Sequence, residues 1–148
     1  MLRESKCPIA KFLDLFGDKW SLIILRDMFM GKKTFNDFLT SQEGIASNIL
    51  TNRLKFLSNS GFIKFKLNPL NKKVKWYYLT DKAVDCYPVI LEMMKWSGKH
   101  LSFDFGDVSK ILEEIKNNPS DKISTKVILK YKSERENLIS ESLNSIQV

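Results

Sequence analysis

The sequence has few of the residues from which catalytic, metal and redox sites are usually built. Its 148 residues include two cysteines, Cys7 and Cys86, and one histidine, His100. There is no Cys-x-x-Cys pair and no glycine-rich phosphate loop, and no serine has a histidine at motif spacing. This set is too small to ligate a structural zinc ion. We therefore expect neither an enzyme nor a protein that holds a metal or a cofactor.

Long hydrophobic runs are also missing. No apolar stretch approaches the roughly 20 residues that a membrane-spanning helix requires. The first residues include Arg3, Glu4 and Lys6 and lack the apolar segment of a signal peptide. With 43% hydrophobic and 28% charged residues, the composition is that of an ordinary globular domain. The sequence predicts a cytoplasmic protein that does not use a membrane.

Acidic residues are absent from one long segment, residues 44–80. The chain has a net charge of +7, and this segment contains seven lysines and arginines but no aspartate or glutamate. The regions before and after it are close to neutral. A solvated surface usually mixes both signs, whereas a surface that contacts nucleic acid does not. The segment therefore indicates binding to double-stranded DNA.

The helical spacing of apolar residues predicts four helices in the first part of the chain. They cover approximately residues 8–16, 18–30, 34–39 and 46–59, and Asp18 is expected to cap the second. The third begins at Thr34, and the carboxylate of Asp37 completes a capping box with that hydroxyl. Two short helices joined by a turn at Gly44 form a helix-turn-helix, whose second helix enters the major groove of DNA.

The helix over residues 46–59 has a polar face opposite an apolar stripe, which consists of Ile49 or Leu50, then Leu54 and Leu57. Its predicted DNA contacts are Ser47, Asn48, Thr51, Asn52, Arg53 and Lys55. Asparagine side chains pair with adenine, and a threonine methyl contacts the methyl group of thymine. Two alternatives remain for this face: it is plain solvent-exposed surface, or Arg53 forms an ion pair within the fold instead of contacting DNA.

Apolar and basic residues alternate over residues 63–67 and 73–78, which predicts a hairpin with a turn at 68–71. The residues expected on its core side are Ile63, Phe65, Leu67, Val74, Trp76 and Tyr78. The opposite side is expected to carry Lys64, Lys66, Lys73 and Lys75. A basic hairpin behind a recognition helix is a wing. Its lysines, with Lys32, Lys33 and Lys72, are expected to bind phosphates without reading sequence.

A long helix is predicted to follow, with Thr80 as its cap. Apolar residues recur in it at intervals of three and four, the spacing of a seam between two helices. The seam residues are Val84, Tyr87, Leu91 and Met94. Pro88 is expected to bend this helix or to remove one of its hydrogen bonds. From the spacing alone, the seam packs either within one chain or between two subunits.

Several short motifs occur in an order that is typical of one family. They are Cys7-Pro8, Gly17-Asp18-Lys19-Trp20, Gly31-Lys32-Lys33-Thr34-Phe35, Gly44-Ile45, Leu50-Thr51-Asn52-Arg53-Leu54, Gly61-Phe62-Ile63, Tyr78-Leu79-Thr80 and Trp96. Over residues 5–100 the sequence resembles the HxlR-type regulators, winged helix-turn-helix transcription factors related to the MarR group. The resemblance implies a homodimer on a palindromic operator, a dimer interface built from helices at both ends of the domain, and no enzymatic activity.

The sequence departs from the family pattern in three places. The family's Gly-Ile-Ser is Gly44-Ile45-Ala46 here, so the helix cap is expected to move to Ser47. The wing has Asn71-Lys72-Lys73-Val74 where the family usually carries a proline pair and an arginine. The tail is longer than the family usually shows. We therefore divide the chain into residues 1–105, the winged helix-turn-helix domain with its dimerisation helices, and residues 106–148, a helical extension.

The resemblance also implies that some relatives sense electrophiles or oxidants through the cysteine that Cys7 matches. Cys7 precedes Pro8, a residue favoured in the first turn of a helix, and the positive end of a helix dipole favours the reactive thiolate. A cysteine retained for packing is the alternative.

The sequence thus predicts an α+β, mostly α fold, a winged helix-turn-helix with a two-stranded β wing and terminal dimerisation helices. It predicts a homodimeric regulator that binds an inverted repeat in DNA and responds to an oxidant or a small-molecule inducer. The competing predictions are a winged-helix module that binds protein, and a regulator that senses a small apolar ligand in a dimer cavity.

Overall fold

The computed structural model describes residues 4–144, and the chain forms two compact units that divide between Thr80 and Asp81. The first unit contains α1 (Pro8–Phe16), α2 (Ser21–Phe29), α3 (Phe35–Leu39), α4 (Ser47–Asn59), β1 (Ile63–Leu67) and β2 (Lys75–Leu79). The second contains α5 (Asp81–Val84), α6 (Tyr87–His100), α7 (Val108–Lys116) and α8 (Ser120–Asn144). Helices dominate and the strands form an antiparallel pair, which confirms the predicted fold class. Within residues 4–144, each helix is too short or too polar to cross a bilayer.

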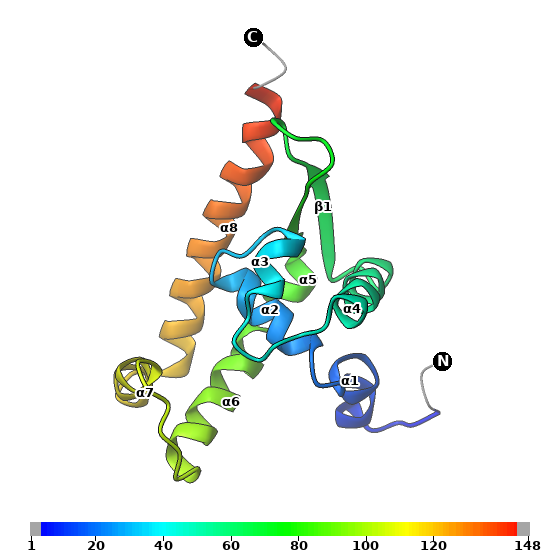
Figure 1. Ribbon diagram of the computed structural model, residues 1–148. Helices are drawn as coiled ribbons and strands as arrows, with labels where there is room; N and C mark the ends of the chain where they lie inside the picture. Colours follow the sequence, from blue (N-terminus) through cyan, green and yellow to red (C-terminus); the bar gives the residue numbers. More distant parts are fainter. Residues whose placement is uncertain (1–3, 145–148) are drawn as a thin grey trace. The chain divides into compact units, whose positions relative to one another are not determined.

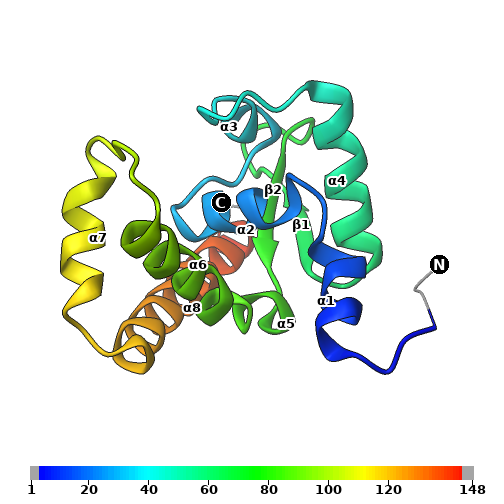
Figure 2. The ribbon, with the colours of Figure 1, turned by 90° about the horizontal axis from the view of Figure 1, so that it is seen from below.

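In the first unit, the two strands lie between α2 and α4 (Figure 2). Each element turns an apolar side toward a common core, whose most buried side chains include Leu25, Met28, Phe38, Leu50 and Leu57. Removing one such side chain from water stabilises the fold by about 1.5–3 kcal/mol. The leucine stripe of α4 thereby fixes which face of that helix points outward.

The second helix begins two residues later than the sequence predicts, with Trp20 in the cap position. We expected Asp18 to be its cap, but α2 begins at Ser21. The Asp18 carboxylate nevertheless accepts the backbone N–H groups of Trp20 and Ser21, at 2.8 and 2.9 Å. Asp18 therefore satisfies backbone donors at the start of α2 although it lies outside the helix. The spacing of apolar residues alone does not show whether such a residue is the cap or lies before it.

The helix-turn-helix has the predicted capping box. The Thr34 hydroxyl accepts the Asp37 N–H at 3.1 Å, and the Asp37 carboxylate accepts the Thr34 N–H at 2.9 Å. Gly44 has a φ of +70°, a conformation that favours glycine, and it turns the chain toward α4. The expectation that Ser47 caps α4 is wrong. Ala46 has the extended dihedrals of the cap residue and offers no side-chain acceptor, and Ser47 is the first helical residue.

The wing differs from the prediction in which side chains share a face. The register pairs Ile63 with Leu79, Lys64 with Tyr78, Phe65 with Tyr77, Lys66 with Trp76 and Leu67 with Lys75. Residues directly opposite each other lie on the same side of a sheet. Trp76 and Tyr78 therefore share the side of Lys64 and Lys66, and Lys75 shares the side of Phe65. The predicted separation into an apolar face and a four-lysine face is wrong.

The loop of the hairpin sets this register. The Asn68 N–H donates to the Val74 carbonyl at 2.8 Å, and side chains of Asn68 and Asn71 accept backbone N–H groups within the loop. The pairing of the second strand is consequently shifted by one residue from the predicted register. A one-residue shift moves every side chain of that strand to the opposite face. Phe65 is 43% exposed, so the outer part of the hairpin stands away from the core.

The predicted long helix after Thr80 is two helices, α5 and α6. The Thr80 hydroxyl does not cap a helix but donates to the carbonyl of Gly61 at 2.7 Å. Pro88 lies in the first turn of α6, where a missing N–H costs no helical hydrogen bond, so it bends nothing. The expected bend is thus replaced by a break before Tyr87.

In the second unit, α6 packs against both α7 and α8 (Figure 1). Arg135 of α8 pairs with Asp81 of α5 at 2.7 Å, which also lowers the pKa of that carboxyl. Val84 and Leu91 of the predicted seam are fully buried within the chain, so they are not available to a second subunit in this arrangement. The sequence places a boundary at residue 105, whereas α6 and the extension beyond it pack as one unit.

Candidate nucleic-acid interface

The outward face of α4 carries the residues predicted to contact DNA bases. Five of the six predicted residues are exposed, namely Ser47, Asn48, Thr51, Asn52 and Lys55. The opposite side of the helix is closed, because Leu50, Leu54 and Leu57 are buried. The helix thus presents a polar, acid-free surface that its own packing holds in place.

The three central side chains of this face offer complementary chemistry. The Thr51 hydroxyl donates to the Ser47 carbonyl at 2.9 Å, so its methyl group and oxygen lone pairs remain for a partner. Within residues 4–144, the amides of Asn48 and Asn52 have no hydrogen-bond partner. Each amide can donate and accept at once, which matches the edge of adenine in the major groove.

Arg53 pairs within the fold, as the alternative prediction held. Its guanidinium lies 3.4 Å from the Asp18 carboxylate and over the ring of Phe56, 5.1 Å from the ring centroid. Burial alone would raise the pKa of Asp18, but hydrogen bonds from Ser21 and Trp20 and the charge of Arg53 lower it overall. Arg53 therefore connects α4 to the segment between α1 and α2.

Behind the turn of the helix-turn-helix lies an ionic cluster that we call the Asp27 network, formed by Arg26, Asp27, Lys32, Ser41 and Glu43. Asp27 is only 2% exposed, and its carboxylate accepts hydrogen bonds from Arg26 at 2.7 Å, Lys32 at 3.4 Å and the Ser41 hydroxyl. Arg26 in turn makes a bidentate pair with Glu43, at 2.6 and 3.0 Å. The network fastens the turn before α4 to α2.

The charges of this network stabilise one another. The hydrogen bond from Arg26 lowers the pKa of Glu43 to about 2, although partial burial opposes the shift. The same bond raises the pKa of Arg26. Both groups therefore stay ionised over the whole physiological range, and the turn keeps a fixed geometry.

Three of the predicted phosphate-binding lysines are engaged inside the fold. Lys32 belongs to the Asp27 network, and its ammonium also donates to Ser41 at 3.2 Å. The Lys33 ammonium lies over the ring of Trp76, 4.0 Å from the centroid, and that of Lys66 lies 5.1 Å from the same ring. Trp76 thus joins the segment before α3 to the wing through cation–π contacts.

The remaining wing lysines are exposed. They are Lys64, Lys72, Lys73 and Lys75. Lys75 still lies over the ring of Phe65, 4.2 Å from the centroid, and its charged end is accessible. The exposed cations of the wing thus come from its tip and from both faces of the hairpin, and not from one four-lysine face.

Sequence reasoning missed Asp27 and Trp76 as residues that build the interface. Asp27 lies on α2, outside the basic segment, and its partner Ser41 is 14 residues away in the chain. No helical or strand period links residues so far apart. The neighbouring Arg26 and Asp27 in a largely apolar helix, followed by Lys32, were the local signal for the network. Trp76 was assigned to the core because the strand phase was assigned one residue out.

Comparison with known proteins agrees with this geometry. The HxlR-like helix-turn-helix family matches residues 15–104. YdeP of Bacillus subtilis, a helix-turn-helix-type transcriptional regulator, is 36% identical over 95 residues, which cover 64% of this chain and 73% of YdeP. The reduced form of the transcriptional regulator YodB from B. subtilis matches with a TM-score of 0.54 and 26% identity, covering 66% of this chain and 97% of YodB. The redox regulator HypR in its oxidized form matches with a TM-score of 0.57 and 30% identity, covering 66% of this chain and 100% of HypR.

A recognition helix with an exposed polar face, next to a basic wing, is typical of a DNA-binding transcriptional regulator of the winged helix-turn-helix class. The family match spans more than half of the residues, including the whole helix-turn-helix and the wing. The chain therefore belongs to the HxlR-like helix-turn-helix family. Helices α7 and α8 lie beyond the matched residues.

Proposed function

We propose that the protein is a homodimer that binds an inverted-repeat operator, with α4 of each subunit in the major groove of one half-site. The observation that carries this proposal is the outward face of α4, where Asn48, Thr51 and Asn52 are exposed and offer donors, acceptors and a methyl group. A two-fold dimer presents two such helices to half-sites whose centres lie about one helical turn apart. A partner of this kind implies that the protein acts in the cytoplasm, beside the chromosome.

The exposed lysines of the wing bind the phosphate backbone in this proposal. Lys64, Lys72, Lys73 and Lys75 carry accessible charges and have no nearby carboxylate in their own segment. Lys32, Lys33 and Lys66 raise the positive potential of the same surface while they hold its shape. Arg53 orients α4 and does not read a base.

The subunit contact is proposed to lie on the apolar outer side of α6. Val89, Met93 and Trp96 follow one another at intervals of four and three and are 39%, 51% and 59% exposed. They line a shallow hollow together with Pro88, Glu92 and Ser97. Of the four predicted seam residues, Tyr87 and Met94 are partly exposed and can contribute at its edge. An exposed apolar stripe of this kind is typical of a surface that is covered in the assembled protein.

Footprinting combined with sedimentation tests the dimer and its operator together. We expect the native protein to sediment as a dimer and to protect two half-sites about 10 base pairs apart. Trp96→Glu should yield a monomer and lose both protections, because it places a charge in the apolar contact. Leu129→Glu is the matched control, since Leu129 is 62% exposed on α8. A single asymmetric half-site, or a Trp96→Glu variant that remains dimeric, would refute the proposed assembly.

We also propose that Cys7 makes the regulator responsive to electrophiles and oxidants. Cys7 is exposed and occupies the cap position of α1, directly before Pro8. The relative HypR is a redox regulator, and YodB has been solved in reduced, diamide-treated and quinone-bound forms. In the proposed step, the thiolate sulfur adds to an electrophilic carbon of a quinone, and the thiol proton ends on the adduct. With a peroxide, the sulfur becomes a sulfenic acid and the peroxide is reduced to water.

The structure supplies a path from α1 to the DNA-reading surface. Phe16, at the end of α1, stacks edge to face on Phe62 just before the wing, with ring centroids 4.7 Å apart. Asp18, two residues further on, pairs with Arg53 of α4. A displacement of α1 by an adduct on Cys7 therefore acts on both α4 and the wing.

The two cysteines give this proposal a matched control. Burial and the charge of Asp85 raise the pKa of the Cys86 thiol, although Lys82 opposes the shift, so Cys86 is poorly reactive at neutral pH. We expect benzoquinone to release operator DNA from the native protein and from Cys86→Ser but not from Cys7→Ser. Release of Cys7→Ser at the same quinone concentration would overturn the sensing role and leave the DNA-binding proposal standing.

A further inference from the structure

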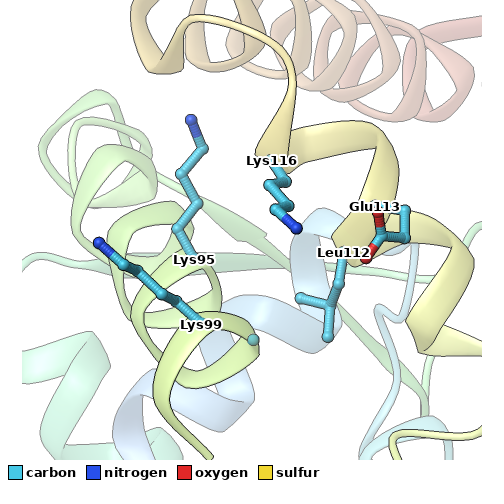
Figure 3. A pocket seen from close by; sticks show the side chains of 6 residues that line it. Lys95, Lys99, Leu112, Glu113 and Lys116 are labelled. Atoms are coloured by element: carbon cyan, nitrogen blue, oxygen red, sulfur yellow. The ribbon is translucent and has the colours of Figure 1, made fainter.

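The second unit contains a pocket that the DNA-binding proposal does not use. It has a volume of about 450 Å³ and opens between α6 and α7 (Figure 3). Its lining residues are Lys95, Gly98 and Lys99 of α6 and Leu112, Glu113 and Lys116 of α7. The size falls in the range of about 300–1,000 Å³ that is typical of small-molecule sites.

The floor of the pocket is apolar because of a close approach at Gly98. A Cβ atom added there would lie 3.3 Å from the Leu112 Cδ2 atom, tighter than an ordinary contact. The bare backbone of α6 and the methyl groups of Leu112 therefore meet directly. This arrangement leaves an apolar wall against which a ring or a short hydrocarbon chain can pack.

The rim of the pocket is positively charged. Three lysines surround it, against the single carboxylate of Glu113. Lys95 is held at the rim by hydrogen bonds to the Asn118 carbonyl at 2.9 Å and the Ser120 hydroxyl at 2.7 Å. Within residues 4–144, Lys99 and Lys116 form no ion pair. Lys116 extends from α7 into the gap between the helices, whereas the Lys99 side chain points away from α7 (Figure 3).

We propose that this pocket binds a small organic carboxylate, with its apolar body against Leu112 and its negative charge at Lys116. A neutral apolar molecule would gain nothing from the Lys116 ammonium, and a bare inorganic anion would leave the apolar wall unused. An organic carboxylate satisfies both parts of the site. The pocket belongs to the second unit and lies partly beyond the residues that match the family, so this proposal is independent of operator binding.

The test is a titration of the full-length protein with sodium benzoate, followed by amide resonances in two-dimensional NMR at constant ionic strength. We expect saturable shifts at Gly98, Lys99, Leu112 and Lys116. Lys116→Ala should weaken binding roughly tenfold, because it removes a charge-assisted hydrogen bond. Lys99→Ala should change the affinity little, because the Lys99 side chain points away from α7 (Figure 3). Lys110→Ala, an exposed lysine on the same helix but outside the pocket, should leave the affinity unchanged.

Two further probes separate the parts of the site. Benzamide, which has the same ring without the charge, should bind at least tenfold more weakly than benzoate. Inorganic phosphate should also bind more weakly, because it cannot use the apolar wall. The proposal is overturned if benzamide or phosphate binds as tightly as benzoate, if Lys116→Ala binds benzoate as tightly as Lys110→Ala, or if the shifts lie outside the pocket.

Discussion

Two polar clusters in the first unit use similar side chains in opposite ways. In the Asp27 network, every charged group has a partner of the opposite sign, and Asp27 itself is buried. On the outward face of α4, Asn48 and Asn52 are exposed and have no partner within the described residues. The two clusters are joined by the short turn from Ser41 to Ala46.

The difference teaches which polar residues maintain the structure and which are available to a ligand. A polar group that is already satisfied gains little from DNA, since a new contact must first break an old one. An exposed and unpaired group loses only its bound water when it forms a hydrogen bond with DNA. Lys32 and Arg53 look like DNA contacts in the sequence, and both are satisfied within the fold. Mutations in the two clusters should therefore separate stability from recognition.

The largest effect is expected for Asp27→Ala. Removing this carboxylate leaves Lys32 and the buried Ser41 hydroxyl without their acceptor and Arg26 with Glu43 alone, and we expect a loss of about 3 kcal/mol in the free energy of unfolding. Urea denaturation followed by circular dichroism measures it. Asn52→Ala serves as the control and should unfold at the native midpoint. A loss below about 1 kcal/mol for Asp27→Ala would mean that the network does not hold the turn.

A smaller effect, confined to binding, is expected for Asn52→Ala. It should weaken operator binding by about 1–3 kcal/mol and leave non-specific DNA almost unaffected, because a lost base contact affects only one sequence. Competition titrations with operator and scrambled DNA measure both. Lys73→Ala is the matched comparison. It should weaken both DNAs alike and reduce the slope of log K against log salt by about 1. If Asn52→Ala weakens both DNAs equally, Asn52 does not read a base.

The smallest effect is expected from acid acting on Glu43. Its pKa is lowered from 4.5 to about 2 in the folded protein, so the pair with Arg26 stabilises the fold fully above pH 4.5. That contribution is lost as the pH falls from 4.5 toward 2. We expect about 1 kcal/mol, because the Glu43 side chain is one-third exposed and screened by water. The stability difference between native protein and Glu43→Gln, measured at pH 6 and pH 3, should shrink at the lower pH. A difference that is constant with pH would exclude the pair as its source.

The sequence predicted the local parts of the interface well. The Thr34–Asp37 capping box and the buried leucines of α4 depend on residues three and four apart, and both are confirmed. The failures involve information that is not local. Residues 74–79 contain apolar side chains in both alternating phases, so only the bonds of the loop reveal that Trp76 lies on the lysine side. A periodic pattern also does not predict the partners of Asp27, because Ser41 lies 14 residues away in the chain.

In the second unit, too, the sequence pattern did not reveal which elements pack together. The spacing of Val84 and Leu91 correctly marked a buried stripe, but spacing does not reveal which surface covers it. In the structure both residues are buried within one chain, and α6 packs against α7 and α8. The open apolar stripe at Val89, Met93 and Trp96 was not singled out, because its period is the same as that of the buried one.

The bidentate pair between Arg26 and Glu43 has a consequence for the order of folding. Its two residues are 17 positions apart, whereas each helix of the helix-turn-helix forms from contacts three or four residues apart. Local helices form faster than contacts that must close a longer loop. A newly made chain should therefore possess α3 and α4 before the angle between them is fixed. We expect this ion pair to close late, when the turn that leads into α4 is fastened to α2.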